Sequence, residues 1–311
     1  MTLAIVCSGQ GRQHSGMFAV TGEAAAARGL FGVATRLLKE DPRAMVQNMP
    51  AEALRHNRTA QILCALQALA AAAVLQPALP DRIVVAGYSV GEVAAWGVAG
   101  LFDAETAMEL VARRAEVMDR ASPPGDGLLF VRGLARSVIE KLCARHEVAI
   151  AIVNPGDAFV LGGSRIALDG LGAEALAMHA QRVVNVAVEV ASHTARLAQA
   201  SALYREILIA APLHFPPPSG KRLLSGIDGA PVLDAATGLD KLAAQISQTV
   251  QWAACLEACM EAGATAFLEL GPGPALSEMI TGAYPGVPAR SLDDFKSVEG
   301  VHTWLSRYAT T

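Results

Sequence analysis

Short apolar runs and longer helical patterns alternate along this chain, which is typical of an α/β protein. The apolar runs are rich in β-branched residues and too short for helices, so we expect them to be buried strands. They comprise residues 3–7, 83–86 and 266–270. Each run leads into a Gly-containing turn, as a strand does where it leaves a sheet.

Five longer stretches have the composition and the end signals of helices. They are residues 60–75, 90–99, 104–121, 194–210 and 241–262. Asp103 stands where it can cap the third of these, and Gly100 ends the second. The first is rich in Ala, but Gln61 and Gln67 interrupt it. We therefore expect a buried helix there rather than a membrane span.

The segment 125–188 is divided into shorter elements than the rest of the chain. Its pattern predicts strands at 128–134, 148–153, 158–163 and 182–190, and helices at 137–145 and 166–179. The resulting βαββαβ order is that of a ferredoxin-like unit. We therefore expect an inserted subdomain at 125–188, with 1–124 and 189–311 together forming the large domain.

Composition and charge exclude several classes of function. Apolar residues make up 52% of the 311 positions and charged residues 17%, which indicates a large core. The net charge of −4 favours no nucleic-acid partner. The five cysteines lack zinc-ligand spacing, so we expect buried free thiols and no metal. The first residues lack the basic and apolar regions of a signal peptide, which favours a cytoplasmic protein.

A serine ends the second apolar run, inside the sequence Gly87-Tyr88-Ser89-Val90-Gly91. This is the G-x-S-x-G pattern, and its setting between a strand and a helix is the one that a nucleophile elbow requires. The glycines permit a tight turn, and the serine hydroxyl is expected at the strand end beside a helix N-terminus. Ser89 is therefore the candidate nucleophile.

His193 is the best candidate base among the seven histidines. It follows a predicted strand and precedes a predicted helix, which Ser192 or Thr194 could cap. Catalytic groups of open sheets collect at such element ends. No nearby acid stands out as a third member of a triad.

Arg114 lies on the apolar face of the predicted helix 104–121. A rotation of about 100° per residue places it on one stripe with Leu110, Val111 and Met118. Arg113 falls on the opposite, charged face. A guanidinium on an apolar face requires an anionic partner. That partner is either a buried carboxylate of the protein or a substrate carboxylate, and the helix pattern does not decide between them.

Gln10 lies in the Gly-rich turn after the first apolar run, in the sequence SGQGRQ. It is either an ordinary loop residue or a residue at the sheet edge that Ser89 occupies. In the second case its backbone N–H could stabilise an oxyanion.

Seven segments resemble motifs of the malonyl-CoA:acyl-carrier-protein transacylase family, which includes acyltransferase domains of polyketide and fatty acid synthases. They are, in order, SGQGRQ, AQILCALQ, GYSVGE, RRAEVM, VASH, QISQTVQW and LELGPGPAL. The resemblance covers essentially the whole chain. It implies an α/β-hydrolase-like large domain with a parallel sheet and an inserted ferredoxin-like subdomain, in agreement with the pattern of elements.

The resemblance implies an acyltransferase that carries malonyl from malonyl-CoA to the phosphopantetheine-type thiol of an acyl carrier protein, without a cofactor. Ser89 would be the nucleophile and His193 its base. The backbone N–H groups of Gln10 and Val90 would form the oxyanion hole, and Arg114 would bind the malonyl carboxylate.

The segment QISQTVQW resembles QxxxPVxW, in which a backbone carbonyl orients the catalytic histidine. Its first residue is Gln245, which the resemblance implies for this role. Thr249 stands in place of the proline, Tyr88 in place of the usual histidine before the nucleophile, and Ser192 in place of a frequent phenylalanine. The smaller Ser192 bears on whether the pocket excludes branched malonyl groups.

The opening LAIVCSGQGRQHSGMF and the elbow GYSVGE most resemble the epsilon subunits of bacterial malonate decarboxylases. These subunits load malonyl onto the carrier subunit of the decarboxylase. A transacylase of fatty acid or polyketide synthesis is the alternative. A serine hydrolase or thioesterase is the alternative from another class.

Overall fold

The central sheet of the large part is parallel throughout; the structure, a computed structural model, describes residues 2–309. Its strands are β1 (Thr2–Cys7), β2 (Ile83–Gly87), β7 (Lys221–Leu223), β9 (Ala264–Leu270) and β10 (Ala289–Ser291). Their order is β10-β9-β1-β2-β7, so β1 and β2 lie side by side in the middle. The turns that carry Gln10 and Ser89 therefore lie at the same sheet edge, where open α/β sheets bind ligands.

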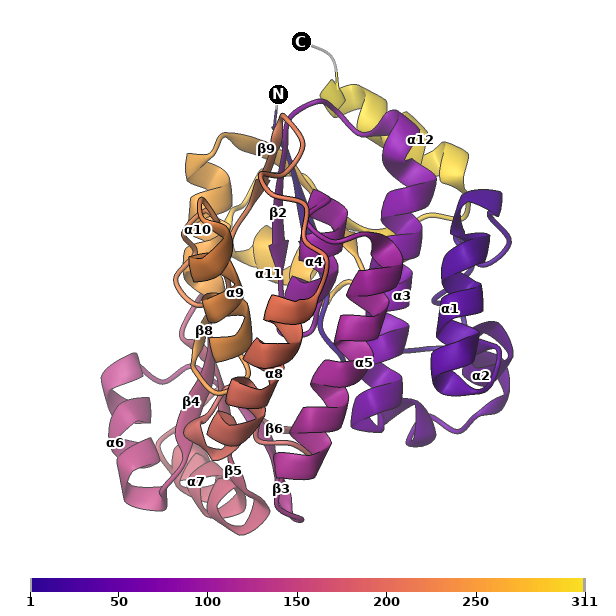
Figure 1. The fold of residues 1–311 in the computed structure, drawn as a ribbon. Helices are drawn as coiled ribbons and strands as arrows, with labels where there is room; N and C mark the ends of the chain where they lie inside the picture. Colours follow the sequence, from indigo (N-terminus) through magenta and orange to yellow (C-terminus); the bar gives the residue numbers. More distant parts are fainter. Residues whose placement is uncertain (1, 310–311) are drawn as a thin grey trace.

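Helices surround this sheet on both faces, and α3, α4 and α5 pack against one another (Figure 1). The helices of the large part are α1 (Arg28–Leu38), α2 (Pro42–Asn48), α3 (Asn57–Leu75), α4 (Gly91–Ala99), α5 (Ala104–Ala121), α8 (Ala198–Ala210), α9 (Ala235–Ala244), α10 (Trp252–Glu261), α11 (Ala275–Ala283) and α12 (Val298–Ala309). By length and composition the stretch Asn57–Ala78 could cross a membrane. However, 72% of its apolar window is buried inside the molecule, so α3 is the core helix that was predicted.

A second sheet carries the βαββαβ pattern of the segment 125–188. Its elements are β3 (Asp126–Arg132), α6 (Arg136–His146), β4 (Ala149–Asn154), β5 (Ala158–Ser164), α7 (Arg165–Ala177) and β6 (Arg182–Val186). The strands pair antiparallel in the order β6-β3-β5-β4, and α6 and α7 pack beside them at the lower end of the view in Figure 1. The α/β class with a parallel sheet and a ferredoxin-like unit is confirmed.

Two predicted elements are wrong in extent. The stretch 241–262 is not one helix, because α9 ends at Ala244 and α10 begins only at Trp252. Between them, β8 (Val250–Gln251) pairs in parallel with β4. The contact with the small sheet overrides the local helical pattern, and the Thr249 hydroxyl reinforces it by donating to the Ile150 carbonyl at 2.7 Å.

The strand predicted at 182–190 pairs with β3 only up to Val186. The apolar alternation continues beyond that residue because Val188 and Val190 pack into the core of the large part instead of extending the small sheet. Alternating apolar residues indicate which side chains are buried, and a side chain can be buried without its backbone pairing in a sheet.

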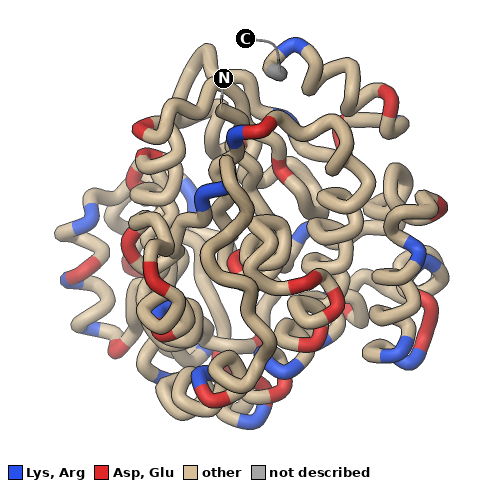
Figure 2. Tube along the Cα trace, turned by 45° about the horizontal axis from the view of Figure 1, so that its top comes forward, with Lys and Arg blue, Asp and Glu red and all other residues tan. Residues whose placement is uncertain are grey.

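Charged side chains of both signs are interspersed along the chain trace (Figure 2). The five cysteines are buried and free, and burial raises the pKa of each thiol. Within residues 2–309 no group of three or more His, Cys, Asp or Glu side chains could hold a metal ion.

Candidate active site

Ser89 occupies a strained turn between β2 and α4. Its φ of 57° lies in the left-handed region that L-residues rarely adopt, which is a property of nucleophile elbows. The flanking glycines are required by space. A Cβ at Gly87 would lie 2.2 Å from the backbone of Glu92, and one at Gly91 would lie 2.1 Å from the Cys7 carbonyl oxygen. The turn therefore packs directly against β1 and raises the serine above the sheet edge.

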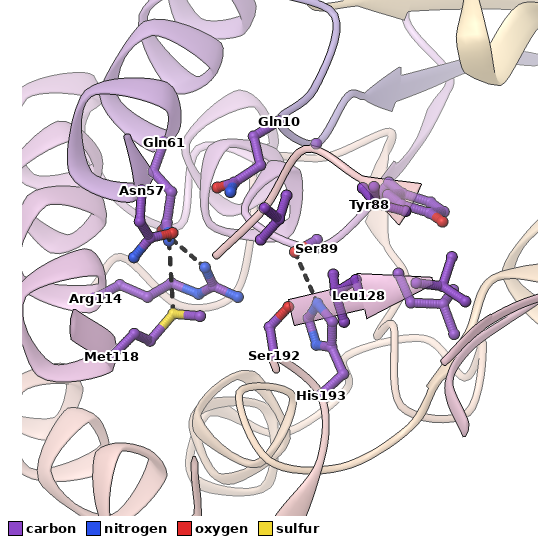
Figure 3. A pocket seen from close by; sticks show the side chains of 15 residues that line it. Gln10, Asn57, Gln61, Tyr88, Ser89, Arg114, Met118, Leu128, Ser192 and His193 are labelled. Atoms are coloured by element: carbon purple, nitrogen blue, oxygen red, sulfur yellow. Dashed lines mark hydrogen bonds between the residues drawn. The ribbon is translucent and has the colours of Figure 1, made fainter. Parts of the chain in front are cut away.

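His193 faces Ser89, with its Nε2 atom 2.8 Å from the Ser89 hydroxyl (Figure 3). It too has a left-handed φ, of 63°. Neither of the expected neighbours caps the next helix: Thr194 donates instead to the Ala191 carbonyl at 2.7 Å. The helical segment that follows begins as a 3₁₀ turn at Ala195–Leu197 before it becomes α8.

The backbone carbonyl of Gln245 lies 2.5 Å from His193 Nδ1. Since a carbonyl only accepts, Nδ1 carries the proton, and Nε2 is free to accept from Ser89. Burial, together with the charge of Arg114, lowers the pKa of His193 to about 3. The imidazole is therefore neutral at physiological pH, as a base must be before it reacts.

Arg114 is buried on the apolar face of α5, with only 1% of its surface exposed. Arg113, by contrast, lies at the surface 3.3 Å from Glu116, as predicted for the charged face. No carboxylate of residues 2–309 forms an ion pair with Arg114. Its Nη1 donates to Gln61 Oε1 at 2.7 Å and its Nη2 to Gln245 Oε1 at 3.0 Å.

The pKa of Arg114 falls to about 10 because the side chain is buried, so the guanidinium is still charged at neutral pH. Its Nε has no partner within the described residues. The sequence left two possible partners for Arg114, a protein carboxylate or a substrate carboxylate. Among the described residues no carboxylate is paired directly with Arg114. A buried cation that is bound only by amide oxygens retains capacity for an anion.

Gln10 and Val90, the two residues expected to form an oxyanion hole, are both near Ser89. Gln10 lines the same pocket as Ser89, and Val90 precedes the first residue of α4. No hydrogen bond within residues 2–309 occupies either N–H group. A helix N-terminus and a free amide beside a nucleophile are the elements of an oxyanion hole.

These groups line one pocket between the sheet edge and the small subdomain (Figure 3). Its polar side contains Gln10, Ser89, Arg114 and His193. Its apolar side comes mainly from strands of the small sheet: Leu128, Ile152, Val160 and Val186, together with Val188. The pocket therefore combines a serine–histidine pair, a buried cation and an apolar wall.

Two of the three residues that depart from the family pattern, Ser192 and Tyr88, lie at this pocket. Ser192 lines it directly, whereas the Tyr88 ring points away from Ser89 (Figure 3). Tyr88 packs edge-on against Trp252 at 5.3 Å between ring centroids. The tyrosine thus joins the elbow to the start of α10.

Three polar side chains of the site were not identified from the sequence. Gln61 binds Arg114 and also donates to Asn57 Oδ1 at 2.7 Å. Glu92 is buried beneath the elbow and accepts from the Gln245 side chain at 2.7 Å. Burial raises the pKa of Glu92 to about 7. A glutamine inside an Ala-rich buried helix was the available signal for Gln61, as the stripe position was for Arg114.

Comparison with known proteins gives matches over most of the chain. The family model described as acyl transferase domain matches residues 4–302. The malonyl CoA-acyl carrier protein transacylase of Haemophilus influenzae is 29% identical over 97% of this chain and 98% of its own length.

Solved structures of the same kind superpose closely. The malonyl CoA-acyl carrier protein transacylase of Coxiella burnetii has a TM-score of 0.91 and 26% identity, covering 100% of this chain and 98% of the other. A malonyl-transacylase solved in complex with a type II PKS acyl-carrier protein has a TM-score of 0.90 and 25% identity, covering 99% of this chain and 100% of that one.

Proposed function

Since this chain belongs to the acyl transferase domain family, we propose that it transfers malonyl from malonyl-CoA to the thiol of an acyl carrier protein. One observation supports this most directly: a buried arginine without a carboxylate partner shares a pocket with a serine–histidine pair. Such a pocket accepts an acyl group that ends in a second, negative charge.

The first half-reaction forms a malonyl-serine ester. His193 Nε2 takes the Ser89 proton as the hydroxyl oxygen attacks the thioester carbonyl. The oxyanion accepts hydrogen bonds from the N–H groups of Gln10 and Val90, each worth about 3 kcal/mol in comparable sites. The intermediate then collapses, the C–S bond breaks, and the histidinium returns its proton to the CoA thiolate.

The second half-reaction is the reverse with a different thiol. The carrier thiol gives its proton to His193 and attacks the ester carbonyl, and the Ser89 oxygen leaves and takes the proton back. The Gln245 carbonyl stabilises the histidinium that forms in each half, because its hydrogen bond favours the charged ring. This explains how the reaction proceeds without a triad carboxylate.

Arg114 holds the malonyl carboxylate through both halves. The guanidinium has five N–H donors, of which Gln61 and Gln245 take two, so three remain for the ligand. An acetyl group offers no anion to this buried charge. We therefore propose that Arg114 selects malonyl over acetyl.

For the acceptor, we propose the carrier subunit of a malonate decarboxylase. The support is the resemblance of the chain opening and the elbow to the epsilon subunits of those enzymes. The solved malonyl-transacylase that is bound to a carrier protein supports a carrier as partner in general. The buried thiols and the burial of α3 support a soluble protein that acts in the cytoplasm.

The test is a loading assay with radiolabelled malonyl-CoA and two purified carriers, one from a malonate decarboxylase and one from fatty acid synthesis. We expect label on both the enzyme and a carrier, with faster loading of the decarboxylase carrier. Faster loading of the fatty-acid carrier would assign the chain to fatty acid synthesis. Malonyl-CoA consumption at the same rate without any carrier would instead indicate a thioesterase.

A further inference from the structure

Arg114 is connected to two carboxylates that it does not touch, through side-chain amides. On one side Nη2 donates to Gln245 Oε1, and Gln245 Nε2 donates to Glu92 Oε2 at 2.7 Å. We call this chain the Gln245 relay. It combines a buried cation, an amide and a buried anion.

The second connection leaves from the other terminal nitrogen. Nη1 donates to Gln61 Oε1, Gln61 Nε2 donates to Asn57 Oδ1, and Asn57 Nδ2 donates to Asp119 Oδ1, the last two at 2.7 Å each. We call this chain the Gln61 relay. It ends at an exposed carboxylate, whereas the Gln245 relay ends at a buried one.

The polarity of both relays is fixed by their ends. A carboxylate can only accept and a guanidinium can only donate, so each amide between them has one orientation that satisfies every bond. In that orientation the amide oxygens of Gln61 and Gln245 face Arg114. A reversed Gln245 amide would place its NH₂ group against the guanidinium and its oxygen against Glu92.

We propose that Glu92 is a positioning residue for the carboxylate-binding arginine, acting through the Gln245 amide. Its other oxygen accepts from the Gly226 N–H at 3.0 Å, so both oxygens receive donors. These two hydrogen bonds favour the carboxylate form and partly offset the burial that raises the pKa of Glu92 to about 7. A Cβ at Gly226 would lie 2.5 Å from Glu92 Oε2, so the backbone closes tightly around the carboxylate.

The arrangement solves a specific difficulty of an anion-selective pocket. A carboxylate in direct contact with Arg114 would compete with the substrate for the same N–H groups. Held one amide away, Glu92 still offsets the buried positive charge while the remaining N–H groups stay free for the ligand. The same Gln245 side chain also donates to the Ser89 carbonyl at 2.8 Å, which ties the relay to the nucleophile turn.

This inference rests on the proposed malonyl transfer, and its test compares malonyl-CoA with acetyl-CoA in the same variant. In Glu92→Gln one of the two acceptor oxygens becomes an NH₂ group. The Gly226 N–H is fixed in the backbone and keeps the remaining oxygen, so the new NH₂ group faces the Gln245 NH₂ group, and the Gln245 amide turns and presents NH₂ to Arg114. We expect the ratio of malonyl to acetyl kcat/KM to fall about tenfold or more, since hydrogen bonds to charged groups are strong. The malonyl KM should carry most of the loss.

Gln245→Met is the second variant, because it removes the relay and keeps the backbone carbonyl that His193 contacts. It should lower the same ratio by a similar factor, and the double variant should lose little more than either single one. The matched control is Glu269→Gln, which neutralises another buried carboxylate whose donors, such as Ser8 and Ser277, lie outside the relays. That control should keep the ratio.

An unchanged ratio in folded Gln245→Met protein overturns the relay, whether or not Glu92→Gln folds. So does additivity of the two losses in the double variant. A wild-type protein that forms no malonyl-enzyme rejects the proposed function instead. The two failures are therefore distinguishable.

Discussion

Replacing Arg114 by Ala should abolish the selectivity for malonyl that we propose for this pocket. The wild-type guanidinium is buried and charged, and three of its five N–H donors have no acceptor among residues 2–309. Each hydrogen bond between charged groups contributes about 1.5–3 kcal/mol. Two such bonds to the malonyl carboxylate amount to about 4 kcal/mol, or about a thousandfold in kcat/KM.

The truncation also leaves two acceptors without a donor. Gln61 Oε1 and Gln245 Oε1 would then face the pocket and the substrate carboxylate, which adds repulsion to the lost attraction. The acetyl group of acetyl-CoA has no carboxylate. Its rate of transfer should therefore fall only to the extent that the loop at Gln245 rearranges after the truncation. The expected loss is therefore selective.

The assay measures kcat/KM for carrier loading with malonyl-CoA and acetyl-CoA in parallel. Arg113→Ala is the matched control, since its neighbouring guanidinium is on the exposed face of the same helix. It should leave both rates and their ratio close to wild type. Equal losses for malonyl and acetyl in Arg114→Ala would falsify the selectivity argument.

Three further predictions concern the elbow and the histidine. Ser89→Ala should form no radiolabelled acyl-enzyme from malonyl-CoA; label that remains covalently bound contradicts the assignment of the nucleophile. The free energy of unfolding of Ser89→Gly, measured by denaturant titration, should exceed that of Ser89→Ala by about 1 kcal/mol, because glycine adopts the φ of 57° without strain. The reverse order would show that the turn is not strained. His193 has a pKa of about 3 when folded against an ordinary value of 6.5, so the unfolded chain binds a proton first as pH falls. Its contribution to stability should be present above pH 6.5 and decline from there toward pH 3. Urea unfolding of wild type and His193→Gln over this range should show a steeper decline of the unfolding free energy in the wild type. Parallel declines in the two proteins would contradict the burial effect.

The parts of the site that local patterns specify were predictable from the sequence. Ser89 was identified by its glycines and by the strand before it, and Arg114 by its position on an apolar stripe, because burial of a charge is visible at helical spacing. The role of the Gln245 carbonyl was predicted only from the resemblance of QISQTVQW to a family motif. Its amide contacts could not be predicted, since they depend on how α5, the elbow and the 245–249 loop meet in space.

The error at 241–262 has the same origin. Helix formers dominate that stretch, yet Val250 and Gln251 pair with β4, a strand that lies far away in the sequence. Local propensity contains no information on such a partner, and tertiary contacts override it. The glutamine relays were missed for this reason as well, because their members come from four separate regions of the chain.

The two-residue strand β8 has a mechanical consequence for the small subdomain. It is hydrogen-bonded to β4 and lies only five residues beyond the carbonyl that contacts His193. Any movement of the small sheet must therefore displace β8, and with it the backbone that sets the orientation of the imidazole. The subdomain is therefore not an independent lid, because its sheet is coupled through β8 to the backbone that orients the catalytic imidazole.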